Sequence, residues 1–357
     1  MSDRKIDVLV AEDSTVVRMF LVHLLESDPQ IRVIGAVGDG QSALEFVNER
    51  RPDVVLMDIH MPRLDGFEAT RRIMETQPVP IVICSATTDV KDMVITFRAM
   101  EAGAIACIEK PLGRGHGDFE AMAAHLLQTV KLMSEVKVVR RTARPVPAPF
   151  PAAYPARREP PQAPIKLIGI GASTGGPPVL QTILAGLPKD FPAPVLVVQH
   201  IARGFLAGMA EWLNQTTGLQ VHVASMGTCP QPGHVYLAPD DFHMGIGAGG
   251  AIVLTREEPE NHLRPAVSFL FRSLARECGA SALGVLLTGM GKDGAAELKA
   301  MKDKGAITIV QDRESSVVHG MPGEAIALGG ATHVLAADKI AAALARLVNH
   351  RNGLSRT

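Results

Sequence analysis

Short aliphatic runs alternate with longer amphipathic stretches along most of this chain. In the N-terminal part the aliphatic runs are Ile6–Val10, Ile31–Val37, Val54–Met57, Pro80–Cys84 and Ala104–Ile108. Runs that are apolar throughout are typical of strands buried on both faces of a parallel sheet, and the stretches between them have helical spacing. We therefore predict a doubly wound α/β domain with a five-stranded parallel sheet over residues 1–140.

The same alternation resumes in the C-terminal part of the chain. Its strand-like runs are Lys166–Ile170, Pro194–Gln199, Gln220–Ala224, His234–Leu237, Ala251–Leu254, Leu283–Thr288 and Ala306–Val310. They predict a second doubly wound α/β domain, with a mainly parallel sheet, over residues 165–350. The segment Val221–Thr255 is rich in glycine and has no helical pattern, so we expect antiparallel hairpins there, inserted in the parallel sheet or flanking it.

A proline-rich segment separates the two parts. Eight prolines lie between Ala143 and Pro164, and proline lacks the N–H group and the free φ that a helix interior or a central strand needs. Residues 141–164 are therefore predicted to be an extended Pro/Arg-rich linker. The length of 357 residues agrees with two domains, at about 150 residues per domain.

Charge, hydropathy and cysteine content exclude several classes of protein. The 36 Lys and Arg residues nearly balance the 37 Asp and Glu residues, which gives no basis for nucleic-acid binding. No apolar run reaches the ~20 residues that span a bilayer, and the N-terminus lacks the apolar core of a signal peptide. The four cysteines are scattered without a CxxC pair, which indicates reduced thiols rather than disulfides or a zinc site. We expect a cytoplasmic protein that is not integral to a membrane.

Charged and polar side chains follow several strands of the first predicted domain. Glu12 and Asp13 follow the first strand, Asp58 follows the third, and Ser85 and Lys110 end the fourth and fifth. Because the carboxyl ends of parallel strands meet in one crevice, these side chains should lie close together. Three carboxylates repel one another unless a cation joins them, and their hard oxygen atoms suit Mg²⁺. A hydroxyl and an ammonium group beside that ion would cradle a phosphoryl group.

Residues 5–130 resemble the receiver domain of bacterial response regulators. The resemblance rests on the residues just named, on MPRLDG at residues 61–66 and on the Lys110–Pro111 pair. It implies that Asp58 accepts a phosphoryl group from a histidine kinase. It also implies that Glu12, Asp13 and Asp58 bind Mg²⁺. Ser85 and Lys110 would contact the phosphoryl group.

Two motifs compete for the sequence KLIGIGASTGGPP at residues 166–178. Glycines 169, 171 and 175 form a loose dinucleotide fingerprint, whereas GASTG at residues 171–175 matches the G-x-S-x-G nucleophile elbow. A dinucleotide site needs an acid about 20 residues later, at the end of the second strand. That strand ends instead in Gln199–His200. A histidine there favours the elbow, because a serine hydroxyl needs a base to become nucleophilic.

Three side chains could then form a catalytic triad. Ser173, His200 and Asp293 each follow a separate strand of the predicted parallel sheet, so we expect them to meet. In that arrangement Asp293 would hold the tautomer of His200, and the backbone N–H groups of Thr174 and Met290 are candidate oxyanion donors. Each side chain also has an ordinary structural interpretation: Ser173 and Asp293 as helix caps, and His200 as a buried histidine at a strand end.

The sequences GIGASTGGP, VVQHI and TGMGKDGA together resemble the catalytic domain of chemotaxis protein-glutamate methylesterases. With a receiver domain in front, the resemblance covers nearly the whole chain. It implies that Ser173 is the nucleophile, His200 the base and Asp293 the acid that orients the base. The implied reaction is hydrolysis of glutamyl γ-methyl esters on chemoreceptors, with release of methanol, in chemotaxis adaptation. Deamidation of receptor glutamines is implied too, and ester hydrolysis needs no cofactor.

Two other classes of function remain to be compared with this one. The chain could be a response regulator whose output domain only binds a partner, which would make the three side chains coincidental. It could also be a redox or nucleotide-binding enzyme, which the missing acid after the second strand disfavours. Labelling by a serine-reactive fluorophosphonate separates the esterase from the binding module.

Overall fold

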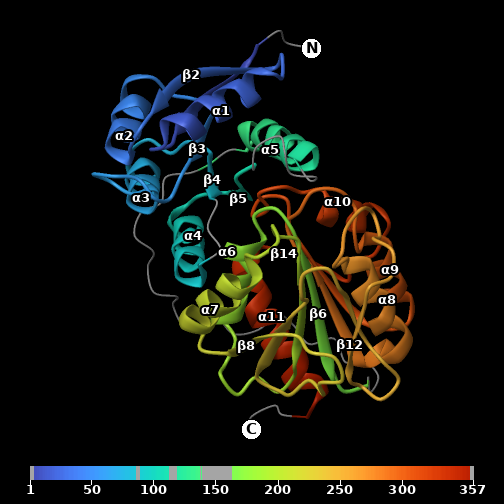
Figure 1. Ribbon diagram of the computed structural model, residues 1–357. Coiled ribbons are helices and arrows are strands. Elements are labelled where there is room, and N and C mark those ends of the chain that lie inside the picture. Colours follow the sequence, from blue (N-terminus) through green and yellow to red (C-terminus); the bar gives the residue numbers. More distant parts are fainter. Residues whose placement is uncertain (1–3, 86–88, 112–118, 137, 139–162, 354–357) are drawn as a thin grey trace. The chain divides into compact units, whose positions relative to one another are not determined.

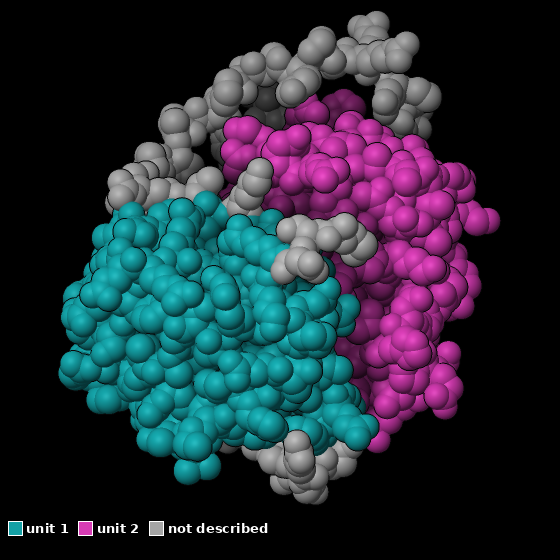
Figure 2. All heavy atoms as spheres, turned by 90° about the horizontal axis from the view of Figure 1, so that it is seen from above, with its two compact units in different colours: residues 1–142, 201–212 teal, residues 143–200, 213–357 magenta. Residues whose placement is uncertain are grey.

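The computed structural model describes residues 4–85, 89–111, 119–136, 138 and 163–353 (Figure 1). The predicted linker lies outside these ranges except for Ala163 and Pro164. The chain divides into two compact units, residues 1–142 with 201–212 and residues 143–200 with 213–357, which Figure 2 shows in different colours. Among the described residues, no helix is long and apolar enough to cross a bilayer.

The first unit contains the predicted five-stranded parallel sheet, with strand order β2-β1-β3-β4-β5. Every residue of β3 and β4 is buried, as a sheet covered on both faces requires. The strands are β1 (Ile6–Ala11), β2 (Ile31–Val37), β3 (Val54–Met57), β4 (Ile81–Ser85) and β5 (Ala106–Glu109). The helices are α1 (Thr15–Glu26), α2 (Gly40–Glu49), α3 (Gly66–Thr76), α4 (Val90–Ala102) and α5 (Phe119–Ser134).

The second unit contains a seven-stranded parallel sheet with order β14-β13-β12-β6-β7-β9-β8 and an antiparallel pair, β10-β11. The predicted fold class is therefore confirmed. The strands of the large sheet are β6 (Leu167–Ala172), β7 (Val195–Gln199), β8 (Gln220–Val223), β9 (His234–Leu237), β12 (Ala282–Leu286), β13 (Ile307–Gln311) and β14 (His333–Leu335). The antiparallel pair is β10 (His243–Ile246) and β11 (Ile252–Thr255).

Helices and one short 3₁₀ turn connect these strands. They are α6 (Gly176–Ala185), α7 (Leu206–Thr217), α8 (Val267–Glu277), η1 (Gly279–Ser281), α9 (Ala295–Asp303), α10 (Met321–Ala327) and α11 (Ala337–Arg351). From β6 the chain builds the sheet first toward β7 and later, through β12, in the opposite direction. This reversal is the topological switch point at which doubly wound sheets form their sites.

The expectation for Val221–Thr255 is wrong in part. Strands β8 and β9 lie in this segment but pair in parallel, with Val221 opposite Val235, and extend the large sheet beyond β7. Only β10 and β11 form the expected antiparallel hairpin. The error has a physical reason: the connection from β8 to β9 is a crossover without a helix, so the pattern between the two strands resembles that of a hairpin loop.

Glycines in β6 allow helix α8 to lie directly on the strand. A Cβ on Gly169 would lie 2.4 Å from Leu274 Cδ1, and one on Gly171 would lie 2.3 Å from Val267 Cγ1. Both distances are too short for any real Cβ contact. The packing of α8 on β6 therefore requires glycine at both positions. The two glycines that suggested a dinucleotide fingerprint thus have a structural role.

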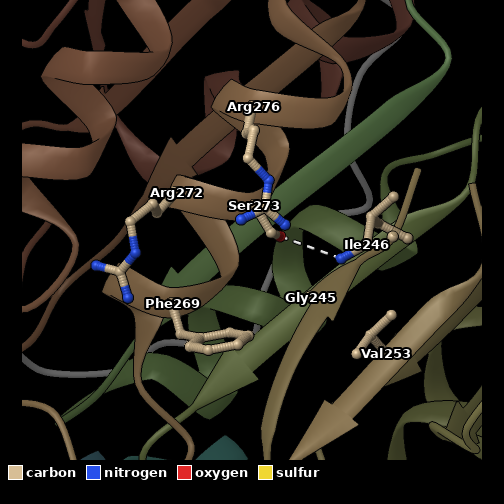
Figure 3. Close-up of a pocket in the computed structure, with 8 residues that line it drawn as sticks. Gly245, Ile246, Val253, Phe269, Arg272, Ser273 and Arg276 are labelled. Carbon is tan, nitrogen blue, oxygen red and sulfur yellow. Dashed lines mark hydrogen bonds between the residues drawn. The ribbon is translucent and has the colours of Figure 1, made fainter.

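A small cavity of about 90 Å³ lies between α8 and the β10-β11 pair. Phe269, Arg272 and Arg276 of α8 border it, and the Ser273 hydroxyl accepts a hydrogen bond from the Ile246 N–H at 3.1 Å (Figure 3). Arg272 is engaged in ion pairs with Glu260 and Glu297. The cavity contains none of the predicted site residues.

Candidate functional site

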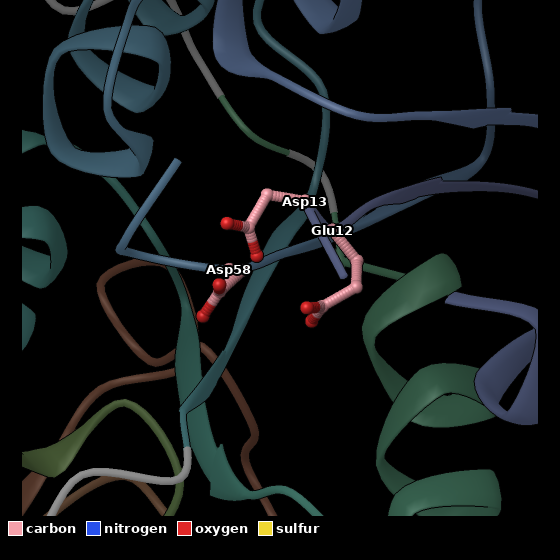
Figure 4. A group of neighbouring side chains, drawn as sticks. All are labelled: Glu12, Asp13 and Asp58. Atoms are coloured by element: carbon pink, nitrogen blue, oxygen red, sulfur yellow. The ribbon is translucent and has the colours of Figure 1, made fainter. Parts of the chain in front are cut away.

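Three carboxylates meet at the carboxyl ends of β1 and β3 in the first unit. Glu12 and Asp58 are 2% and 5% exposed, whereas Asp13 is exposed to solvent. One carboxylate oxygen of each residue lies within 4.8 Å of the others, and the three side chains lie near one another (Figure 4). Two buried acids and one open side suit a cation such as Mg²⁺, which keeps several waters. The predicted acidic cluster is therefore present.

Lys110 and Ser85 lie at the same edge of the sheet. The Lys110 Nζ atom is 2.7 Å from Glu12 Oε2 and 2.8 Å from Asp58 Oδ1. The contact with Glu12 is an ion pair without good hydrogen-bond angles, since Oε2 has no hydrogen-bond partner. Ser85 is 1% exposed, and its carbonyl accepts a hydrogen bond from the Lys110 N–H at 2.9 Å. The structure thus brings all five residues predicted for this crevice to one edge.

The charges of this cluster shift one another's pKa. Burial raises the pKa of Glu12, and the neighbouring charge of Asp58 adds to this, although Lys110 opposes both effects. Burial alone would lower the pKa of Lys110, but the charges of Asp58 and Glu12 outweigh it and raise that pKa. Lys110 is therefore a fixed positive charge beside Asp58.

In the second unit Ser173 follows β6 in a tight turn before α6. The Ser173 N–H donates to the Thr288 carbonyl at 3.0 Å, and the Ser173 carbonyl accepts from the Gly176 N–H at 2.8 Å. Gly175 has φ 75°, a left-handed conformation that favours glycine, and forms the N-cap of α6 without a side-chain bond. The serine is therefore not the cap of α6, so its ordinary structural interpretation does not hold.

His200 and Asp293 meet beside this turn. His200 Nε2 lies 3.0 Å from Asp293 Oδ2, and both side chains are largely buried, at 10% and 2% exposed. The contact is within ion-pair distance but has no hydrogen-bond geometry. Among the described contacts, no hydrogen bond joins the Ser173 hydroxyl to His200. Loose alignment of this kind is common before a substrate binds.

Asp293 also caps a helix, but this helix is α8 and not α9, which follows Asp293 in the chain. Helix α8 begins after Ala266, whose side chain accepts no hydrogen bond. Instead, Asp293 accepts from the Val267 N–H at 2.6 Å and from the Ser268 N–H at 3.1 Å. Burial would raise the pKa of Asp293, but the contacts with His200 and with these N–H groups outweigh it and lower that pKa. Asp293 is thus held as a carboxylate beside the imidazole.

One residue that sequence reasoning missed is Gln199, the last residue of β7. It is 6% exposed, and its amide nitrogen donates to the carbonyls of Ser173 at 2.9 Å and His200 at 2.7 Å. Its oxygen Oε1 is buried without a partner and lies where a Cβ on Gly176 would come within 2.1 Å. One amide thus ties the serine turn to the histidine. In the sequence, the feature that could have indicated this role is a polar glutamine at the end of an aliphatic strand, directly before the histidine, because a buried amide needs hydrogen-bond partners.

The two predicted oxyanion donors lie on turns that contact each other. Thr174 follows Ser173, and Met290 follows Gly289, where a Cβ would lie 2.7 Å from Ser173 Cβ. The Thr288 hydroxyl donates to the Thr174 carbonyl at 2.9 Å and accepts from the Val318 N–H at 3.0 Å. The first of these bonds holds the turn after β12 against the turn after β6, and the second ties it to the segment before α10.

Comparison with known proteins finds one family match in each part of the chain. A family model for CheB methylesterase matches residues 168–344, and a model for the response regulator receiver domain matches residues 8–117. The protein-glutamate methylesterase/protein-glutamine glutaminase of Nitrosospira multiformis is 55% identical over 349 residues, which cover 97% of this chain and 98% of the relative. The chain belongs to the protein-glutamate methylesterase/protein-glutamine glutaminase family. The resemblance seen in the motifs is therefore confirmed.

Two further matches agree with membership of this family. The protein-glutamate methylesterase/protein-glutamine glutaminase 4 of Geobacter metallireducens is 56% identical over 343 residues, covering 96% of this chain and 99% of the relative. The crystal structure of the Thermotoga maritima CheB methylesterase catalytic domain matches with a TM-score of 0.50 and 43% identity, covering 52% of this chain and 99% of that one.

Proposed function

We propose that this chain is a phosphorylation-regulated esterase that hydrolyses glutamyl γ-methyl esters on chemoreceptors and also deamidates receptor glutamines. Ser173, His200 and Asp293 would carry the hydrolysis, and Asp58 would carry the regulation. The observation that supports the esterase best is the buried contact of 3.0 Å between His200 and Asp293 beside the serine turn. A module that only binds a partner does not need a buried carboxylate paired with an imidazole, next to a serine that caps no helix.

The proposed reaction has two steps. The Ser173 hydroxyl attacks the ester carbonyl carbon while His200 takes the hydroxyl proton. The bond to the methoxy oxygen then breaks, and methanol leaves with that proton. Water next attacks the acyl-enzyme with His200 as base, which restores Ser173 and releases the glutamate side chain. With a glutamine substrate, ammonia leaves in place of methanol.

The surroundings of the three side chains would serve this reaction. Asp293 faces Nε2 of His200, so Nδ1 is the nitrogen left to receive the serine proton. The carboxylate would favour the imidazolium that forms when the proton moves. The N–H groups of Thr174 and Met290 would stabilise the oxyanion, because hydrogen bonds fix both turns beforehand.

In the first unit, Asp58 is the proposed acceptor of a phosphoryl group from a histidine kinase. Glu12, Asp13 and Asp58 offer three oxygen atoms within 4.8 Å, a donor set that fits Mg²⁺. When bound, this ion would neutralise charge on the phosphoryl oxygens during transfer. Lys110, which pairs with Asp58 at 2.8 Å, would pair with the phosphoryl group, and the Ser85 hydroxyl would donate to it. New pairing of this kind is how phosphorylation shifts a receiver between two states.

Methanol release from membranes with methylated chemoreceptors tests the proposal, with and without Mg²⁺ and a small phosphodonor. We expect release from the full chain and a higher rate with the phosphodonor, whereas Ser173→Ala should release none. A fluorophosphonate probe gives an independent readout, since an esterase is labelled at Ser173. Absence of both methanol release and labelling would favour the alternative of a partner-binding output domain.

A further inference from the structure

The segment between β11 and α8 contains a tight turn that contacts Asp293. The Glu260 N–H donates to the Leu263 carbonyl at 3.1 Å, and the Leu263 N–H donates to the Glu260 carbonyl at 2.8 Å. The two residues between them, Asn261 and His262, have φ values of 53° and 64°. Positive φ at both central positions is the requirement of a type I′ turn, which favours asparagine and glycine there. The reaction proposed above uses neither residue.

This turn brings the amide of Asn261 to the acid that faces His200. Asn261 Nδ2 donates to Asp293 Oδ1 at 3.4 Å. The same oxygen accepts from the Ser268 N–H at 3.1 Å, whereas Oδ2 accepts from the Val267 N–H and faces the imidazole. Asn261 is the exposed member of this set, so it is the partner of Asp293 that a substrate can reach. Catalytic hydrogen bonds are often long before a substrate binds and shorten in the complex.

A series of polar contacts holds the turn against α8 and α9. Glu260 forms an ion pair with Arg272, which projects from α8 (Figure 3). Arg272 Nη1 lies 3.6 Å from Glu297 Oε1 of α9, and the other oxygen of Glu297 accepts from the Ser268 hydroxyl at 2.7 Å. Ser268 in turn donates its N–H to Asp293. The turn is therefore anchored beside the acid by contacts that do not involve the side chain of Asn261.

We propose that Asn261 is a positioning residue of the esterase, whose amide holds the Asp293 carboxylate in place and reduces the negative charge that His200 faces. This inference rests on the function proposed above. Without the amide, Oδ1 keeps only the Ser268 N–H of these two donors, so the carboxylate gains freedom to turn away from the imidazole. A less satisfied carboxylate also favours the imidazolium before the serine proton moves, which removes the base.

The left-handed backbone of the turn offers a substitution that removes the amide and keeps the turn. Glycine adopts positive φ without strain, so Asn261→Gly should leave the unfolding midpoint of the full-length chain nearly unchanged. We expect kcat for methanol release from methylated receptor membranes to fall by about threefold to tenfold, with KM unchanged. His262→Gly is the matched control, because it makes the same change at the next left-handed position. No hydrogen bond or ion pair of the described residues joins His262 to Asp293 or His200, so this variant should retain the parent's kcat.

Asn261→Asp gives a readout that a purely structural role would not change. Aspartate has the same shape and also tolerates left-handed φ, but it has no N–H donor and adds a negative charge beside Asp293. The added charge favours the imidazolium, so the acid limb of kcat/KM against pH should move up by about 0.5 pH units or more. Each variant keeps the ionisable groups on the surrounding elements, which are His200, Glu260, Arg272, Lys292 and Glu297.

The possible results distinguish this inference from the proposed function. Parent-like kcat in Asn261→Gly together with a parent-like pH profile in Asn261→Asp would overturn the role of the amide. Equal losses in Asn261→Gly and His262→Gly would overturn it too, because they would assign the effect to the backbone of the turn. A parent chain that neither releases methanol nor reacts with a fluorophosphonate would instead overturn the proposed function, and this inference with it.

Discussion

Replacement of Asp293 should lower stability and activity together, because one carboxylate both caps α8 and faces His200. In Asp293→Ala, two buried N–H groups of Val267 and Ser268 lose their acceptor. Loss of a cap costs about 0.5–2 kcal/mol, and a buried donor without a partner costs about 1–3 kcal/mol. Since the two effects overlap, we expect unfolding free energy to fall by about 2–4 kcal/mol. Asp293→Asn keeps one acceptor oxygen and should lose less.

The effect on catalysis should be nearly the same for both replacements. An Asp-to-Asn change at the orienting position of a serine protease triad lowers kcat by about 10⁴, through the wrong histidine tautomer. The contact of His200 with Asp293 has the same elements, so we expect methanol release to fall by about 10³–10⁴ in Asp293→Asn with little change in KM. Methanol release and urea unfolding followed by circular dichroism measure the two effects.

The pH dependence of stability separates the carboxylate from other causes. The pKa of Asp293 is lowered in the folded state from its ordinary value of 3.8. Its contribution is therefore fully present above that value and is lost as pH falls through the lower folded pKa. The stability gap between the parent chain and Asp293→Asn should be constant near neutral pH and should shrink only in acid below 3.8.

Asp303→Asn is the matched control, since it changes an exposed carboxylate on α9 whose ion pair, within the described part of the chain, is with Lys299. It should leave both readouts unchanged. Full methanol release by Asp293→Asn would refute the orienting role, and an unchanged unfolding midpoint in Asp293→Ala would refute the capping role.

Three further outcomes are expected. Ser173→Ala and His200→Ala should each abolish methanol release without loss of fold, and the double variant should be no worse, because triad members act as a unit; near-normal release from Ser173→Ala would exclude it as nucleophile. Asp58→Asn should remove the response to a phosphodonor in the presence of Mg²⁺, measured by phosphoryl incorporation, while Glu75→Gln, an exposed acid of α3, keeps it. Gln199→Glu places an acceptor against two carbonyls and should slow fluorophosphonate labelling of Ser173 by about tenfold or more; a lower unfolding midpoint with unchanged labelling would assign Gln199 a purely structural role.

The receiver cluster could be predicted from sequence because a parallel sheet places the carboxyl ends of its strands together. Glu12, Asp58 and Lys110 each follow a strand that is recognisable as an aliphatic run. The rule fixes their proximity without knowledge of strand order. It does not fix pairing, so the double contact of Lys110 with both acids became visible only in the structure.

The parallel pairing of β8 and β9 could not be predicted in the same way. Strand direction depends on how the chain returns between Val223 and His234, and that segment has glycines and prolines where other crossovers have a helix. A glycine-rich return is compatible with either direction, because the hydrophobic pattern of a strand does not encode its orientation. Tertiary pairing with β7 decides it.

The two interpretations of Asp293 that sequence analysis kept apart, helix cap and orienting acid, prove to be compatible in one geometry. The helix that Asp293 caps is α8, and α8 packs through Val267 on Gly171 of β6, the strand that leads to Ser173. Any shift of the first turn of α8 therefore moves the carboxylate that faces His200 and presses on the strand that positions the serine. It follows that a bulkier residue at position 171, two residues before Ser173, should disturb Ser173 and His200 together, since overpacking forces the backbone rather than one side chain to move.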